Sequence, residues 1–532
     1  MRKVTHGIAL TALAALALVA CGGSEAETPA ETASTSDQPS ATTASIRAAT
    51  AFVKVTRGLV IRNATIVNTR NGALSFGMSV IVDQGKIQQI VPTWQVQTSG
   101  TAQVIDAAGK YLVPGFLDMH THSMPYAAST TPHWPLMIAN GITGIRDMAG
   151  APPLLAAAQQ QNAARAAGTL VAPEVLQMPG PPIAGAQTAA EGQAAVQATA
   201  AMGGAFVKVV NASAAAQAAI MTEAAARNLK VAGHLSVGTS AVATANSGWF
   251  ALEHLGGGLG IQLDCSTDQA AIRNALLTGQ GSRPPYPATY TVSPLLYSAL
   301  DAPFYQRSAD TYNASQCDTV ARTIVQKGMW QTPTLLRLRT MTQSDSAEFR
   351  NDPNLKYVDP TLRQLWQQLG QEFSQLQPAS AATTFRAFNT QYVNMLKLLR
   401  RQGAAPKVLA GTDVGGIWVI PGFSLHQEFR ELANAGFTPL EVLQATTLNG
   451  ARFLNRESSM GTVDAGKNAD LVLLNANPLL QVSNLAKIAG VVNAGKYLSQ
   501  ADLDALKASV ATAYANAPLR NVEAVLDHSH KH

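Results

Sequence analysis

Charge is scarce in this sequence and is not gathered in blocks. Only 13% of the 532 residues are charged, and the 38 lysines and arginines barely exceed the 33 aspartates and glutamates. Proteins that bind nucleic acid usually carry a basic patch or stripe. The scattered charge therefore argues against nucleic acid or another polyanion as a partner.

Long apolar runs are also missing. The run from Ile8 to Ala20 is shorter than the roughly 20 residues that a bilayer core demands, and no longer candidate follows it. The glycine-rich stretch Gly256 to Gly260 lacks the Walker lysine and the dinucleotide spacing, so a phosphate-binding loop is not expected. With 47% hydrophobic residues, the chain is globular and long enough for more than one domain.

The N-terminus carries an export signal. Arg2 and Lys3 precede the apolar run, which ends in Leu18-Val-Ala-Cys21 with small residues where a signal peptidase would cut. This ending resembles a bacterial lipobox, which implies cleavage before Cys21 and lipidation of that cysteine. An ordinary signal peptide is the alternative. We expect residues 1–20 to be a lipoprotein signal peptide.

The next stretch, residues 21–51, is composed of Ala, Thr, Ser, Glu and Pro with almost no large apolar residue. It cannot bury enough surface to fold, so it is predicted to be a disordered tether. Gly22 after the cysteine resembles the outer-membrane sorting pattern of a Gram-negative host. The protein is therefore expected to be exported and lipid-anchored on the periplasmic side, at the outer membrane.

Cysteine is rare, with three in the whole chain. Once Cys21 is assigned to lipid, Cys265 and Cys317 remain. An exported protein can oxidise such a pair to a disulfide. Two separately buried thiols are the alternative.

Both flanks of the chain are rich in β-branched residues. Gly58–Asn68 and Met78–Val91 are broken by Asn-Gly and Gln-Gly turn signals and read as hairpin strands. Gly461–Leu474 and Ile488–Lys496 have the same character. We expect residues 52–113 and 457–500 to form one small β-domain.

The middle, residues 114–456, alternates short apolar strands with Ala-rich helical stretches, which is typical of βα units around a parallel sheet. Eight strands are expected, and eight is the number in a (β/α)₈ TIM barrel. Their predicted ends lie near His122, Asp147, Met178, Lys208, His234, His254, Leu335 and Asp413. Long insertions are expected near 265–328 and 337–406. Thr438-Pro-Leu-Glu441 has the pattern of a capped helix start, and residues 501–532 are expected to form a C-terminal helix and tail.

Metal-ligand chemistry is concentrated at these strand ends. His120 and His122 stand two apart, so in a strand both imidazoles point to one side. Barrel enzymes build their sites at the C-terminal ends of strands, and nitrogen and carboxylate ligands suit Zn²⁺ and similar ions. The candidate ligands are His120, His122, Lys208, His234, His254 and Asp413.

Lys208 is the unusual member of this set. An ammonium in the apolar run Ala205-Phe-Val-Lys-Val-Val210 is costly to bury unpaired, and more costly beside metal cations. If its amine has reacted with carbon dioxide, the resulting carbamate is an anion that can bridge two ions. A lysine paired with a carboxylate, or a neutral lysine, is the alternative.

These motifs together resemble the amidohydrolase superfamily of metal-dependent hydrolases, in its binuclear branch, over roughly residues 57–500. They are Val113-Pro-Gly-Phe-Leu-Asp-Met-His-Thr-His122, Gly141–Asp147, Phe206-Val-Lys208, Gly233-His234, Glu253-His254, Gly411-Thr-Asp413 and Gly461–Asp470. The resemblance implies that His120, His122 and Asp413 hold one divalent metal, expected to be zinc, and that His234 and His254 hold another. Carboxylated Lys208 would bridge both metals. It also implies that the terminal strands form a β-sandwich.

The sub-branch looks like the one with prolidase-like and Xaa-Arg dipeptidases and imidazolonepropionase-type enzymes, and Pro421–Glu428 fits it. The resemblance implies hydrolysis of an amide-like C–N bond in a small molecule or short peptide, with a dipeptide or N-acyl amino acid expected. Two ions would activate a shared water, and Asp413 would be both ligand and general acid/base. The oligomeric state is left open, a homo-oligomer included.

Two other classes of function compete with this one. A lactonase, esterase or phosphotriesterase can use the same metals, because such a centre activates water without fixing the electrophile. A non-catalytic binding lipoprotein is the more remote alternative.

Several further residues invite a functional interpretation. Exposed tails are usually disordered, so the tail histidines are not expected to act. His426 is expected to support the site from outside the ligand set or to lie at the surface, and His133 to stand at a helix entry. Tyr126, Trp418 and Arg337 are candidates to line the substrate site because they follow barrel strands. The tail histidines are His528, His530 and His532.

Overall fold

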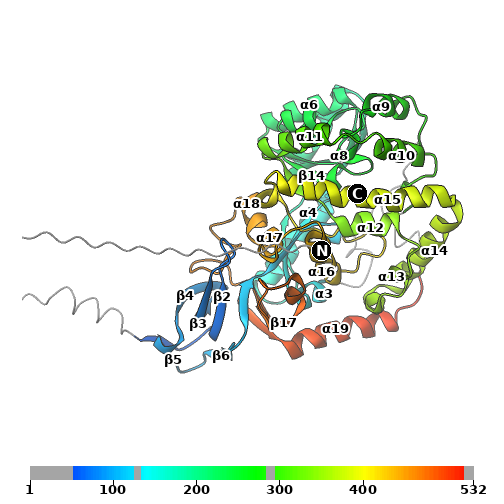
Figure 1. Cartoon of the computed structure of the whole chain (residues 1–532). Helices are drawn as coiled ribbons and strands as arrows, with labels where there is room; N and C mark the ends of the chain where they lie inside the picture. Colours follow the sequence, from blue (N-terminus) through cyan, green and yellow to red (C-terminus); the bar gives the residue numbers. More distant parts are fainter. Residues whose placement is uncertain (1–51, 125–132, 283–293, 521–532) are drawn as a thin grey trace, which may run out of the picture. The chain divides into compact units, whose positions relative to one another are not determined.

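The computed structural model describes residues 52–124, 133–282 and 294–520. The two ends of this range meet in one mixed eight-stranded sheet, with the order β18-β17-β16-β7-β2-β3-β4 and β6 beside β2. Figure 1 shows the blue N-terminal strands and the orange β17 on the same side of the molecule. The strands are β2 (Leu59–Val67), β3 (Leu74–Asp83), β4 (Lys86–Pro92), β6 (Gln103–Asp106), β7 (Tyr111–Pro114), β16 (Leu471–Leu474), β17 (Ile488–Asn493) and β18 (Lys496–Ser499).

The β3–β4 hairpin confirms the turn predicted at Gln84-Gly85. Both residues have positive φ, 51° and 72°, as the tight turns that match strand twist require. A second, parallel pair consists of β1 (Val53–Val55) and β5 (Val96–Thr98). Val55 and Val96 pack with Val60 and Ile81 of the large sheet in a small apolar cluster. The flanks thus have an apolar core of their own.

Parallel strands make up the middle of the chain, in two sheets with the orders β10-β9-β8 and β11-β12-β13-β14-β15. This mixed α/β arrangement is consistent with a TIM-barrel-like domain. The strands are β8 (Phe116–Thr121), β9 (Ile142–Asp147), β10 (Glu174–Gln177), β11 (Ile183–Ala186), β12 (Phe206–Ala212), β13 (Lys230–Gly233), β14 (Ala251–Glu253) and β15 (Trp330–Thr332).

The segment 408–414 connects the two parallel sheets. Parallel bridges join Val408 to Gln331 of β15 and Val414 to Thr121 of β8. The Asp413 N–H also donates to His120 O at 2.7 Å. The segment is nevertheless not a continuous strand, which corrects the prediction that residues 408–413 form one.

Two further details differ from the predicted strands. β12 continues to Ala212, so Lys208 lies inside the strand and not at its end. The extra strand β11 pairs with β12 from Ile183 to Ala186 and supports this extension. Ile183-Ala-Gly-Ala186 has only one β-branched residue, so its β-propensity does not predict a strand there.

Helices follow most of the parallel strands. Those of the βα units are α3 (Trp134–Ala139), α4 (Pro152–Ala166), α5 (Ala189–Ala201), α6 (Ala214–Ala226), α7 (Ala241–Asn246), α16 (Phe423–Asn434), α17 (Pro439–Ala445) and α18 (Leu448–Phe453). The predicted capping box at Thr438 and Glu441 is confirmed at the start of α17. Helix α19 (Gln500–Ala515) is the last helix of the described residues, and it begins one residue before the predicted C-terminal segment 501–532.

The two long segments between β14 and β15 and between β15 and Val408, which include the predicted insertions 265–328 and 337–406, are helical. The first contains α8 (Gly260–Leu263), α9 (Gln269–Leu277), α10 (Ala302–Asp310) and α11 (Ala314–Gln326). The second contains α12 (Leu335–Thr342), α13 (Ala347–Arg350), α14 (Pro360–Leu376) and α15 (Ala379–Arg401). α15 contacts α8, α10, α11 and α12, so the insertions pack on each other.

Cys265 and Cys317 form a disulfide, with Cα atoms 4.4 Å apart, which confirms that prediction. The bond ties the end of α8 to α11, across 52 residues of sequence. In the chain-entropy model a loop of this length adds about 4 kcal/mol to stability. The first insertion is therefore covalently closed.

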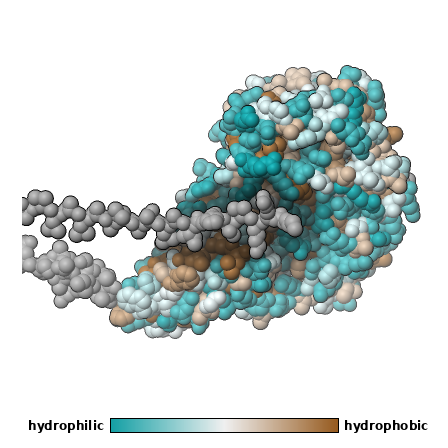
Figure 2. Space-filling view, viewed as in Figure 1, coloured by the Kyte–Doolittle hydropathy of each residue, from teal (hydrophilic) through white to brown (hydrophobic). Residues whose placement is uncertain are grey.

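The surface of the described residues is mixed in polarity. Figure 2 shows hydrophobic residues gathered on the side of the large sheet and mostly hydrophilic or neutral residues over the helices of the insertions. Phe76 of β3 and Trp94, just after β4, are 69% and 60% exposed. Among the described helices, none has the length and apolar character needed to cross a bilayer.

Candidate metal centre

The six predicted ligands lie together. His120 belongs to β8, His122 follows it, Lys208 lies in β12, and His234 and His254 directly follow β13 and β14. The Nε2 atoms of His120 and His122 are each 3.3 Å from Asp413 Oδ1. Lys208 Nζ lies 3.4 Å from His234 Nε2. The ring centroid of His254 is 4.4 Å from that of His120 and 5.0 Å from that of His234, so His254 joins the two groups of ligands.

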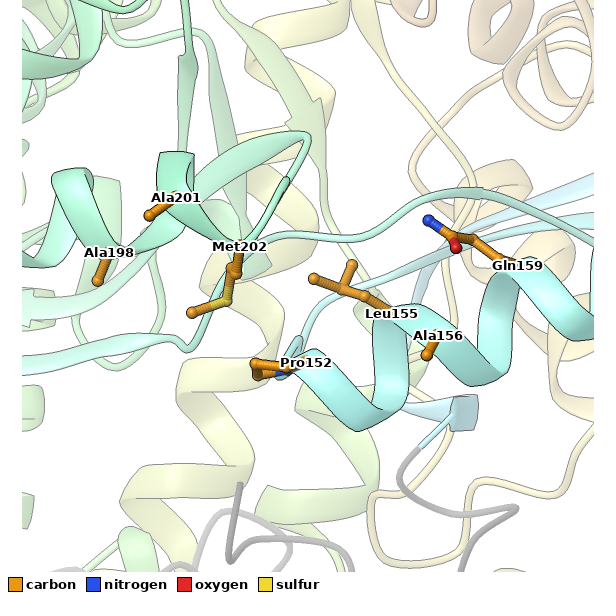
Figure 3. A pocket seen from close by; sticks show the side chains of 7 residues that line it. All are labelled: Pro152, Leu155, Ala156, Gln159, Ala198, Ala201 and Met202. Atoms are coloured by element: carbon orange, nitrogen blue, oxygen red, sulfur yellow. The ribbon is translucent and has the colours of Figure 1, made fainter.

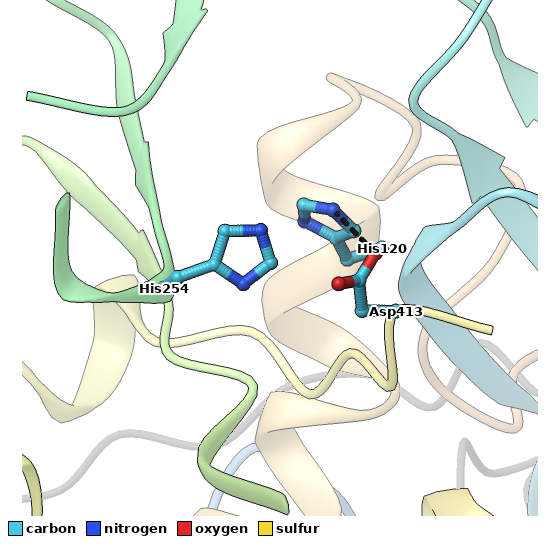
Figure 4. A group of neighbouring side chains, drawn as sticks. All are labelled: His120, His254 and Asp413. Atoms are coloured by element: carbon cyan, nitrogen blue, oxygen red, sulfur yellow. Dashed lines mark ion pairs between the residues drawn. The ribbon is translucent and has the colours of Figure 1, made fainter. Parts of the chain in front are cut away.

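The tightest group within this set is His120, His254 and Asp413. One potential ligand atom from each lies within 4.8 Å of the others. Figure 4 shows His254 pointing from one side toward His120 and Asp413 on the other. This group combines residues that were expected to bind different metals. His254 was expected to bind one metal with His234, and Asp413 to bind the other with His120 and His122.

The geometry of these atoms fits a divalent ion. Ligands about 2.1 Å from one zinc ion at a tetrahedral angle lie about 3.4 Å apart, and the 3.3 Å separations of His120 Nε2 and His122 Nε2 from Asp413 Oδ1 are close to this. His120 Nε2 is buried and makes no hydrogen bond among the described residues. His120 Nδ1 lies 2.7 Å from Glu253 Oε2, so a proton on Nδ1 leaves the Nε2 lone pair facing Asp413 Oδ1. Two electron pairs face each other there, which a cation between them would stabilise.

Two buried charged residues support His120 on the side of its Nδ1 atom. Glu253 Oε1 accepts a hydrogen bond from Arg146 Nη2 at 2.6 Å, and both side chains are fully buried. The Arg146 guanidinium lies between the rings of Phe206 and Phe453, 4.8 and 4.7 Å from their centroids. Histidine ligands of metals usually donate their second nitrogen to a carboxylate, which fixes the tautomer and the ring orientation. Glu253 is placed for this role.

The two acidic groups of the site are held ionised. Burial alone would raise the pKa of Glu253, but the Arg146 guanidinium and the hydrogen bond from His120 hold that pKa well below its ordinary value. Burial opposes ionisation of Asp413 too, and the neighbouring His120 and His254 hold its pKa well below its ordinary value. Carboxylates of this kind are metal ligands without a proton to displace.

The basic groups shift toward their neutral forms. Burial, reinforced by Lys208, lowers the pKa of His234 well below its usual range, and burial with His120 does the same for His254. Burial lowers the pKa of Lys208 to about 8. The charges of Glu253 and Asp413 oppose this lowering of the Lys208 pKa without cancelling it. Neutral imidazoles are the form that binds metals.

Asp413 is fixed from two further sides. Arg337 Nε, on α12, donates to Asp413 Oδ2 at 3.1 Å. Asp118 of β8 accepts hydrogen bonds from the N–H and hydroxyl of Thr412 at 3.0 and 2.6 Å. A Cβ on Gly416 would lie 2.5 Å from Arg337 Nε, so only glycine leaves room for the guanidinium. The Asp413 carboxylate is thus preorganised.

The other candidates are placed as follows. His133 stands at the N-cap of α3, which confirms the helix-entry prediction. His426 lies 3.0 Å through Nε2 from Asn140 O and packs against Phe116, away from the ligand cluster. Trp418 is 2% exposed, and its indole N–H donates to Ser344 O, so it is a core residue. Tyr126, His528, His530 and His532 lie outside the described residues, as does Cys21.

Sequence reasoning missed three participants in the site. Arg146 and Glu253 belong to two of the motifs but were not predicted as site residues. A charged residue inside an apolar strand indicates a buried partner, and this signal could have identified them. Thr334 was not singled out. Its hydroxyl lies 2.5 Å from His254 Nδ1, and nothing local to Thr334 in the sequence indicated that contact.

A separate groove lies between α4 and α5. It has a volume of about 570 Å³. Figure 3 shows that its lining side chains are almost all apolar, with Gln159 the polar exception. None of its residues is a candidate ligand. They are Pro152, Leu155, Ala156, Gln159, Ala198, Ala201 and Met202.

Comparison with known proteins agrees with this geometry. The model of the amidohydrolase family matches residues 111–498, which is most of the chain. The chain therefore belongs to the amidohydrolase family.

Individual curated relatives match only short segments. An adenine deaminase of Rubrobacter xylanophilus is 37% identical over 97 residues, which are 18% of this chain and 16% of that protein. A dihydroorotase of Carboxydothermus hydrogenoformans is 38% identical over 65 residues, 12% of this chain and 14% of that protein. The matched part is thus about a sixth of the length of these relatives.

Solved structures match over nearly the whole described chain. A bottromycin amidohydrolase aligns with a TM-score of 0.62 at 19% identity, over 86% of this chain and 90% of that one. A Xaa-Pro dipeptidase with bound methionine aligns with a TM-score of 0.54 at 16% identity, over 83% and 99%. At these identities the likeness establishes a shared fold.

Proposed function

We propose that this protein is a metal-dependent hydrolase of an amide-like C–N bond, with a dipeptide or an N-acyl amino acid as substrate. The observation that carries the proposal is the buried meeting of His120, His254 and Asp413, with His122, Lys208 and His234 beside them. Membership of the amidohydrolase family supports the reaction class. The dipeptidase among the structural neighbours supports the substrate class.

The proposal includes an architecture. The eight strand positions, with segment 408–414 as the eighth, form a closed (β/α)₈ barrel over residues 114–456. The flanks 52–113 and 457–500 form a β-sandwich, in which the β1–β5 pair packs on the large sheet. The bridges of Val408 and Val414 and the cluster around Val60 support these two assignments.

His120, His122 and Asp413 would hold one divalent ion, expected to be zinc, and His234 and His254 a second. Bound there, the ions would polarise the scissile carbonyl and lower the pKa of a water molecule. Lys208 would bridge them as a carbamate: its neutral amine adds to the carbon of CO₂ and loses one proton. A pKa of about 8 leaves roughly a tenth of the lysine neutral at pH 7, far more than an unshifted lysine would have, which supports this step.

Asp413 is the proposed proton carrier. Its Oδ1 faces His120 and His122, and its Oδ2 accepts from Arg337, so the carboxylate is held at the site in the form that can accept a proton. It would take the proton from water and give it to the leaving amine. Arg337 orients Oδ2 throughout.

The test is metal analysis of the purified protein beside a panel of dipeptides, N-acyl amino acids, lactones and phosphotriesters. We expect two divalent ions per chain, turnover of dipeptides or N-acyl amino acids, and loss of turnover on chelation with recovery on adding zinc. Turnover of lactones or phosphotriesters alone would replace the C–N assignment by that of an esterase-type enzyme. Two bound ions without turnover of any member would favour a binding protein.

We also propose that the protein is exported and lipid-anchored through Cys21 on the periplasmic side of the outer membrane. The disulfide supports an oxidising compartment. Mass spectrometry of the membrane fraction should find a mature chain that begins at acylated Cys21, and Cys21→Ser should release the protein from membranes. A mature N-terminus at another residue, or an unmodified Cys21, would contradict the anchor.

A further inference from the structure

The loop that carries His254 has an unusual backbone. His254, Leu255 and the three glycines 256–258 all have positive φ, of 55°, 52°, 99°, 71° and 54°. Non-glycine residues rarely adopt such angles, and the conformation persists only where the surroundings impose it. Contacts from outside the loop must therefore hold His254 in place.

One such contact comes from the start of α12. Thr334 Oγ1 lies 2.5 Å from His254 Nδ1, and Thr334 is itself fully buried with a φ of 43°. For a β-branched residue this angle is a clear outlier. The N–H groups of the next two residues, Leu335 and Leu336, donate to the Glu428 carboxyl group of α16 at 3.0 and 2.7 Å, which anchors the backbone directly after Thr334.

The second contact comes from α15. The Tyr392 hydroxyl donates to Gly258 O at 2.5 Å and lies 3.1 Å from the Tyr297 hydroxyl. Tyr392 is fully buried, and its ring packs on Phe388 of the same helix. It therefore fixes the far end of the same loop, four residues after His254. Gly257 lies between them, where a Cβ would be 3.4 Å from the His234 ring.

We propose that Thr334 and Tyr392 are positioning residues that hold His254 for metal binding, and that the segment between β15 and Val408 supplies both of them. With a proton on Nδ1, His254 donates to Thr334 Oγ1 and keeps the Nε2 lone pair for an ion. Tyr392 keeps the loop in its left-handed path, so that the ring stays beside His120 and His234. This inference rests on the proposed metal centre.

The experiment is zinc titration of the metal-free full chain by calorimetry, with the visible spectrum of the cobalt-loaded protein as a second readout. Loss of a residue that orients a ligand typically lowers metal affinity by about 10- to 100-fold. We expect that loss for one of the two ions in Thr334→Val and in Tyr392→Phe, with a changed cobalt spectrum. Thr334→Ser keeps the hydroxyl and should stay within about threefold of wild type.

Thr342→Val is the matched control, because Thr342 is equally buried in α12 and its hydroxyl bonds only within that helix, to Leu338 O and Arg339 O. It should bind both ions as wild type does. Tyr392→Phe preserves the aromatic packing, so it carries the test if Thr334→Val does not fold.

Wild-type affinity for both ions in Tyr392→Phe and Thr334→Val would overturn the positioning role alone. Equal losses in Thr334→Ser and Thr334→Val would do the same, since the hydroxyl would then be irrelevant. A wild-type chain that binds fewer than two ions would instead overturn the proposed metal centre.

Discussion

Asp413→Asn is expected to lower kcat by about 10³-fold, within the range that a positioned proton carrier contributes. The amide keeps the shape of the side chain, but it cannot accept the proton from water. It also weakens the interactions of Oδ1 with His120 and His122 and of Oδ2 with Arg337. Turnover of a confirmed dipeptide or N-acyl amino acid measures the loss, with metal content determined on the same sample.

Asp504→Asn is the control, since that aspartate is an exposed residue of α19. Its kcat should equal that of the wild type. If Asp413→Asn retained wild-type kcat with its metals in place, Asp413 would not be the proton carrier.

Glu253→Gln is expected to reduce the free energy of unfolding by about 3–5 kcal/mol, because it leaves the buried Arg146 guanidinium without its counter-charge. The phenylalanine rings on either side of Arg146 cannot replace a carboxylate. The same change should weaken metal binding by about 10- to 100-fold, since His120 loses the acceptor that fixes its tautomer. Urea denaturation and zinc titration give the two quantities.

Glu457→Gln is the matched control. Its partners Arg452 and Arg70 are both 41% exposed and Glu457 itself is 38% exposed, so the change should cost less than about 1 kcal/mol. A similar small loss in Glu253→Gln would show that the buried pair adds little to stability. Unchanged zinc affinity would show that Glu253 does not orient His120.

The sequence indicated where ligands stand because apolar strands followed by histidine or aspartate are a local pattern. His120, His234 and His254 all lie at or just after a strand, as expected. Lys208 was misplaced because β12 continues to Ala212, paired with a strand of low β-propensity. Segment 408–414 pairs with its neighbours through bridges at Val408 and Val414, and Asp413 within it has a φ of 61°, an angle that local sequence does not encode.

The groups that support the ligands were not predictable in the same way. Glu253 of β14 meets Arg146 of β9, five strands earlier in the chain order, and Thr334 meets His254 across an insertion. Both contacts depend on how strands are arranged around the centre. A single sequence gives the residue types but not those pairings.

The pairing of β7 with β16 has a consequence for how the chain matures. Val113 stands opposite Val472, so one edge of β7 has no partner until β16 is synthesised near the end of the chain. Contacts between such distant residues form slowly, because the chain loses the entropy of loop closure before the contacts stabilise it. A nascent or truncated polypeptide that stops before Leu471 presents Leu112 and Val113 on an open edge, which invites aggregation.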